Sequence, residues 1–75
     1  MLYVYQIEDF DTNVAELNVF SSMNKAVAEA EAILKFRRGA ESVSTINDAG
    51  SASIFGYDAD ENRIGHLVIH RLTVR

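Results

Sequence analysis

Residues 21–39 read SSMNKAVAEAEAILKFRRG and are the only stretch of this 75-residue chain with an unambiguous helical pattern. Its apolar residues recur at intervals of three and four and form one stripe: Met23, Ala26, Val27, Ala30, Ile33 and Leu34. Ser21 or Ser22 can cap the first turn, and Gly39 suits the left-handed position that follows a last turn. We therefore expect one helix that packs its stripe against a sheet.

The opposite side of this helix carries Ala28, Ala32 and Phe36, if each residue turns the helix by about 100°. The alanines are explained by helix propensity, with Phe36 curling over the edge of the core. The same row also suits a contact with a partner or a second copy. Both interpretations stay open, and Phe36 is a candidate partner-binding residue.

The segments on either side of the helix read as strands and turns. β-Branched and aromatic residues predict strands at 2–8, 14–20, 52–57 and 63–74, with turns at 9–13 and 58–62. Residues 42–46 are either part of a long loop or a further short strand. The sequence predicts a single α+β domain over residues 1–75. Its antiparallel sheet has four or five strands with one helix packed across a face, in the order ββαββ or ββαβββ.

The alternation within two strands indicates which residues share a face. Ala15, Leu17 and Val19 alternate with Glu16 and Asn18, so one face of that strand is expected to be wet. In the last strand, Ile64, Val68, Leu72 and Val74 share one face, and Leu67 and Ile69 lie on the other.

Composition excludes several classes of protein. The net charge is −4, whereas a dedicated nucleic-acid binder normally shows a basic footprint, so the composition argues against nucleic acid as a partner. No cysteine occurs, which removes disulfides, thiol catalysis and cysteine zinc sites. The start, MLYVYQIEDF, lacks a basic region and a long apolar run, so we expect no signal peptide, no membrane anchor and a cytoplasmic location.

Acidic residues cluster in the two predicted turns and provide the remaining candidate partner contacts: Glu8, Asp9, Asp11, Asp58, Asp60 and Glu61. A strand at 42–46 would place both turns at the same end of the sheet, where the clusters converge into one negative rim. Without that strand, they are expected at opposite ends.

Two motifs suggest metal binding, and neither is complete. The run Asp58-Ala59-Asp60-Glu61-Asn62 opens like a calcium loop, but Arg63 stands where the sharp turn needs glycine and Ile69 stands where a bidentate glutamate is needed. His66 and His70 have the spacing of a helical zinc half-site, yet in a strand they stand roughly 13 Å apart. We expect no metal, no other cofactor and, without a catalytic signature, no enzymatic activity.

The aromatic residues Tyr3, Tyr5, Phe10, Phe55 and Tyr57 suit core packing, a protein interface or stacking on single-stranded nucleic acid. The arginines that the last alternative would use are Arg37, Arg38, Arg63, Arg71 and Arg75.

The junction VFSSMNKAVAEAEAIL, residues 19–34, resembles small phage and bacterial accessory proteins, in which a hairpin, a Ser-capped helix and further strands follow in this order. Anti-CRISPR and other phage-encoded inhibitors are among them. The resemblance implies a short, acidic, non-enzymatic protein that acts by binding another protein. We therefore expect a protein-binding module, with a self-associating structural protein, such as a homodimer, as the alternative and a nucleic-acid-binding module as a third.

Overall fold

The helix forms where its pattern predicts, and its last turn is wider than expected. In the computed structural model, which describes residues 2–74 apart from the side chain of Leu17, helix α1 spans Met23–Ala32. The Ser22 hydroxyl caps it by accepting a hydrogen bond from the Lys25 N–H at 3.2 Å. The chain continues as a π-helical turn, η1 (Ile33–Arg37), in which the Arg38 N–H donates to the Ile33 carbonyl. Gly39 follows with φ of 71°, the left-handed conformation predicted for it.

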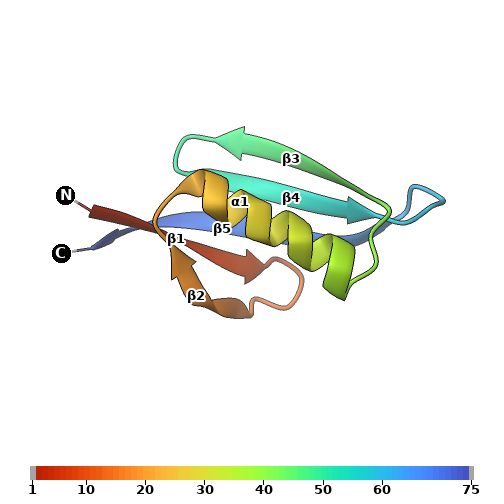
Figure 1. The fold of residues 1–75 in the computed structure, drawn as a ribbon, viewed down its shortest axis with the longest axis horizontal. Coiled ribbons are helices and arrows are strands. Elements are labelled where there is room, and N and C mark those ends of the chain that lie inside the picture. Colours follow the sequence, from red (N-terminus) through yellow and green to blue (C-terminus); the bar gives the residue numbers. More distant parts are fainter. Residues whose placement is uncertain (1, 75) are drawn as a thin grey trace.

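Five antiparallel strands form one sheet in the order β2-β1-β5-β4-β3 (Figure 1). Their bounds are β1 (Leu2–Asp9), β2 (Ala15–Phe20), β3 (Ser42–Asp48), β4 (Ser51–Tyr57) and β5 (Arg63–Val74). The predicted α+β class is confirmed, and the element order is ββαβββ. The open question about residues 42–46 is settled, because β3 pairs with β4 along its whole length, from Ser42 opposite Tyr57 to Asp48 opposite Ser51.

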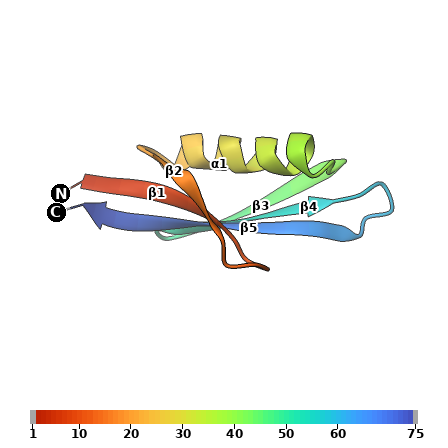
Figure 2. The same cartoon turned by 90° about the horizontal axis from the view of Figure 1, so that it is seen from below.

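The helix covers one face of the sheet, and the core lies between the two layers (Figure 2). The predicted stripe supplies Ala26, Ala30, Ile33 and Leu34 to this core. The sheet contributes its helix-facing residues: Ile7, Ala52, Ile54, Leu67 and Ile69. Only four side chains of this core are both large and fully buried, so burial of apolar surface stabilises the domain modestly.

Leu34 packs onto the sheet at a position where two glycines leave room for its side chain, here called the glycine notch. Gly56 and Gly65 lie opposite each other on β4 and β5. A Cβ atom added to Gly65 would stand 2.7 Å from the Leu34 Cδ2 atom, and one added to Gly56 would stand 3.2 Å from it. The absence of side chains on these two residues therefore lets the helix approach the sheet closely.

The other face of the sheet is uncovered. Since side chains alternate along a strand, this face carries the residues that lie between the core residues of β1, β4 and β5. Val68, Leu72 and Val74 lie on it together, as the sequence predicts, and all three are at least partly exposed.

Strand β2 turns its apolar side toward this uncovered face. Glu16 and Asn18 face the helix, where they line a small hollow of about 110 Å³ with Glu29 and Ile33. Val19 lies on the uncovered side and is exposed. Asn18 is exposed as well, so both faces of this strand reach solvent, and the polar face is the one next to the helix. On the polar face, the Glu16 carboxylate forms an ion pair with Arg37 at the end of the helix, at 3.2 Å.

Both acidic turns lie at one end of the sheet, here called the loop end, where the helix also finishes (Figure 1). This follows from parity, since β3 adds one more reversal between them. The opposite end is formed by the start of β1 and the end of β5, which project as a two-stranded ribbon past the helix (Figures 1 and 2).

Candidate functional site

Asp9 organises the first loop from inside the protein. Its carboxylate accepts hydrogen bonds from the backbone N–H groups of Asp11 (2.9 Å) and Thr12 (3.2 Å), and it forms an ion pair with Arg38. Burial by itself would raise the pKa of Asp9. The hydrogen bonds from Arg38, Thr12 and Asp11 outweigh burial and hold this pKa below 3.8.

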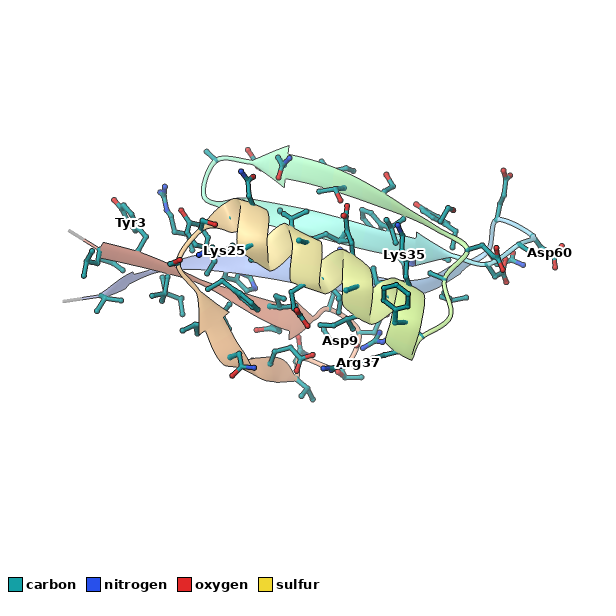
Figure 3. All side chains as sticks on the ribbon, viewed as in Figure 1. Tyr3, Asp9, Lys25, Lys35, Arg37 and Asp60 are labelled. Carbon is teal, nitrogen blue, oxygen red and sulfur yellow. The ribbon has the colours of Figure 1, made fainter. Side chains whose placement is uncertain are left out.

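The position of Asp9 corrects one of the predicted contacts. The residue is 8% exposed, and its charge is already paired, so its carboxylate is not available to a partner. The correction has a physical cause: the side chain points to the helix side of the sheet, where the wide π turn brings the Arg38 guanidinium over it. The labelled Asp9 lies beside this end of the helix in Figure 3.

The next residue, Phe10, points to the uncovered side and begins a column of three stacked rings. The ring of His66 lies between those of Phe10 and Phe55, with centroid distances of 4.4 Å and 4.3 Å. The Arg63 guanidinium stands over the ring of Phe55, 6.0 Å from its centroid. Phe10 remains 56% exposed, so the column presents one rigid aromatic surface at the loop end.

His66 in the middle of this column is buried, and neither of its ring nitrogens has a hydrogen-bond partner. Burial lowers the pKa of His66 below 6.5, and the charge of Arg63 lowers it further, while Asp11 and Asp9 act in the opposite direction. The neutral imidazole therefore functions as a third stacking ring.

In the second acidic loop one carboxylate is also used internally. Asp58 accepts hydrogen bonds from the N–H groups of Asp60 (2.9 Å) and Asn62 (2.8 Å), which close the turn. Glu61 adopts a φ of 64°, a conformation that non-glycine residues rarely adopt. Asp60 and Glu61 are exposed.

The predicted contact residues therefore share one end of the molecule without forming a single rim. Asp11, Asp60, Glu61 and Phe36 are exposed, and Phe36 is 85% exposed on the helix side. Glu8 lies on the uncovered face, 3.9 Å from His70.

The aromatic column is the feature that sequence reasoning missed. In the sequence, Phe10 is only one of the five aromatic residues that suit a core, an interface or base stacking, and nothing sets it apart from the others. Its stacking depends on the pairing of Phe55 with His66 across β4 and β5, which no local pattern predicts.

A hollow of about 300 Å³ lies on the helix side of the loop end, lined by Asp9, Thr12, Val14, Glu16, Arg38 and Leu67. Both arginines beside it are neutralised, Arg38 by Asp9 and Arg37 by Glu16. The hollow therefore offers no free positive charge to an anionic ligand.

Two further findings concern metal ligands and membrane-spanning helices among the described residues. Within residues 2–74, no three His, Cys, Asp or Glu side chains are grouped so that they could hold a metal ion. His66 is enclosed by two phenyl rings, whereas His70 is exposed beside Glu8. No helix in this part of the chain is long and apolar enough to cross a membrane.

Comparisons with known proteins give no family to which the chain can be assigned: no family model, curated protein or solved structure matches it.

Proposed function

We propose that the protein is a non-enzymatic protein-binding module that contacts its partner with the loop end, with Phe10 as its anchor and with the exposed carboxylates of Asp11, Asp60 and Glu61 at the same end. The observation that carries this proposal is the column of Phe10, His66 and Phe55, which holds an exposed aromatic ring in a fixed position. Energetic hot spots of protein interfaces are typically rigid aromatic residues of this kind, surrounded by a polar rim.

The charge of these exposed carboxylates indicates the chemistry of the partner. Asp11, Asp60 and Glu61 are exposed and carry no ion pair among the described residues, so a partner surface with lysine or arginine around an apolar pocket fits them. Such carboxylates speed encounter with a basic partner more than they add affinity, because exposed charges are screened by salt.

The same geometry argues against single-stranded nucleic acid as the ligand. The faces of His66 and the inner faces of Phe10 and Phe55 are occupied by one another, so bases cannot stack on them. Arg37 and Arg38 are paired with carboxylates, and Arg63 and Arg71 lie near opposite ends of β5. Arg75 lies outside the described residues.

Phage-encoded inhibitors are the particular class that we propose for this module. This part of the proposal is supported by the layout of hairpin, capped helix and strands, by the acidic charge and by the small size. The partner would then be a protein of the bacterial host, and the protein would act in its cytoplasm.

The experiment is an affinity capture from bacterial lysate at physiological salt with the wild-type chain and three variants. Phe10→Ser removes the aromatic anchor. A triple variant, Asp11→Asn with Asp60→Asn and Glu61→Gln, removes the exposed carboxylate charges of the loop end. Phe36→Ser is the matched control, because it removes an equally large exposed ring from the helix side of the same end.

We expect one host protein that the wild type and Phe36→Ser both retain, that Phe10→Ser loses, and that the triple variant binds with a slower association rate. Circular dichroism of each variant checks that the fold is kept. If Phe10→Ser still retains that protein, Phe10 is not the anchor of the interface. If Phe36→Ser loses it, the partner contacts the helix side instead. Capture of no protein would refute the proposed function.

A further inference from the structure

Strand β3 forms one border of the sheet, beyond the helix, and one side of its backbone has no partner among the described residues (Figure 1). The Arg71 N–H donates to the Gly50 carbonyl, so the even-numbered residues of β4 bond to β5 and the odd-numbered ones bond to β3. Their partners in β3 are Ser44, Ile46 and Asp48. The residues that alternate with these point their N–H and C=O groups out of the sheet and are here called the free edge: Val43, Thr45 and Asn47.

We propose that the free edge binds an extended segment of a partner protein, which joins the sheet as an additional antiparallel strand. The free edge is regular, because β3 pairs with β4 from Ser42 to Asp48 without a shift in register. Residues 42–47 also contain no charged residue and no proline. Lysine, proline or a bulge at a sheet border normally prevents the addition of another strand. The other border, β2, has such an irregularity, since its register with β1 shifts between Gln6 and Glu8.

The hydrogen-bonding groups of the free edge define the backbone of the bound segment. They recur at intervals of two residues, or about 7 Å along the strand. An extended peptide presents complementary N–H and C=O groups at the same spacing, which is the basis of recognition by strand addition. Peptide residues opposite Val43, Thr45 and Asn47 bond to β3, whereas those opposite Ser44 and Ile46 point their N–H groups away from it.

A carboxylate on the helix side indicates a basic residue in the bound segment. The Thr45 hydroxyl donates a hydrogen bond to the Glu31 carboxylate at 3.1 Å. Glu31 is half-buried and forms no ion pair among the described residues. In an antiparallel pair, the Cβ atom of the residue opposite Thr45 lies about 5 Å from the Thr45 Cβ atom. An arginine or lysine at that position therefore reaches the Glu31 carboxylate.

The other side of β3 and its composition define the segment further. Ile46 points to the uncovered face and is 59% exposed, so a β-branched apolar residue fits opposite it. A second copy of β3, SVSTIND, offers no lysine or arginine to Glu31 and adds another carboxylate at Asp48. The segment therefore belongs to a different protein and carries a basic residue between two β-branched ones. This site is separate from Phe10 and does not depend on the proposed function.

Titration of the wild-type chain with the capped peptide acetyl-GTVRVTG-amide, followed by NMR, tests the proposal. We expect a dissociation constant on the order of 100 μM, because ordering the peptide offsets much of the gain, and slower amide exchange at Val43, Thr45 and Asn47. N-methylation of the arginine removes an N–H that faces β3 and should weaken binding about tenfold or more. N-methylation of the preceding valine is the matched control, since that N–H faces solvent, and should change binding less than about twofold. No binding at about 2 mM peptide, or equal losses from the two methylations, would overturn the proposal.

Two glutamates of the helix supply a second readout. Glu31→Gln should weaken binding of the arginine peptide about three- to fivefold and remove its advantage over a peptide with uncharged citrulline at that position. Glu29→Gln is the matched control, because Glu29 lies on the β2 side of the same helix and should leave binding unchanged. Equal weakening by the two substitutions would overturn the assigned contact with Glu31.

The peptide also separates this proposal from the proposed function. Phe10→Ser should bind the peptide as the wild type does, because Phe10 lies outside the free edge. A chain that captures a host protein through Phe10 and does not bind the peptide would refute strand addition alone. A chain that binds the peptide and captures no host protein would refute the proposed function alone.

Discussion

The glycine notch leads to a prediction about how the helix is held on the sheet. Replacing Gly65 with alanine places a methyl group 2.7 Å from the Leu34 Cδ2 atom, whereas carbon atoms normally approach to 3.5–4.0 Å. Leu34 is fully buried, so its methyl group must move by about 1 Å into occupied space. Overpacking of this kind costs about 1–3 kcal/mol, and alanine regains about 0.5–1 kcal/mol over glycine in a strand. We expect a net destabilisation of about 1–2 kcal/mol.

A double-mutant cycle isolates the cause of this loss. Leu34→Ala alone should lower the free energy of unfolding by about 3 kcal/mol, because it leaves a cavity over the notch. In the double variant the new methyl group at residue 65 occupies part of that cavity. The combined loss should therefore be about 2–3 kcal/mol, well below the sum of about 4–5 kcal/mol for the single variants.

Urea unfolding monitored by circular dichroism measures all four stabilities. Gly39→Ala is the control: no atom lies within 4 Å of the added Cβ, but the φ of 71° makes alanine unfavourable by about 1 kcal/mol. Its effect should add to that of Leu34→Ala. If Gly65→Ala and Leu34→Ala also add to within about 0.5 kcal/mol, the notch does not set the helix position and the reasoning is refuted.

Three further predictions concern stability. In the unfolded state the imidazole of residue 66 takes up a proton near pH 6.5, whereas the buried His66 of the folded protein does so only at lower pH. The free energy of unfolding should therefore decrease as the pH falls below 6.5, by at most about 1.4 kcal/mol per pH unit. His66→Leu should remove this slope in pH-dependent urea titrations. Arg38→Met should cost about 2–3 kcal/mol at pH 7. Calorimetry should show this deficit disappearing as the pH falls below 3.8, since a protonated Asp9 needs no cation and the pKa of Asp9 in the wild type is lowered. Ser22→Ala should cost about 1 kcal/mol and Ser21→Ala less than about 0.5 kcal/mol in thermal unfolding; equal losses would contradict the assigned N-cap.

The candidate site shows where reasoning from local patterns stops. Acidic residues are visible in the sequence, but whether a carboxylate faces solvent depends on contacts made across the fold. Asp9 and Asp11 are two residues apart, yet Asp9 is buried against Arg38, 29 positions away, while Asp11 remains exposed. The aromatic column likewise joins Phe10 to His66 and Phe55, residues from three separate strands or loops.

By itself, the sequence determined the elements whose causes are local: the helix with a serine cap at residue 21 or 22, its buried stripe and the left-handed Gly39, and the strands with their alternation. The order β2-β1-β5-β4-β3, the π turn and the side of β2 that meets the helix were decided only by tertiary structure. The physical reason is that these features depend on contacts between distant residues. Leu34 must reach a notch made by two glycines on different strands, and Arg38 must reach Asp9. The uncovered face was decided in the same way, since one helix can cover only one side of the sheet.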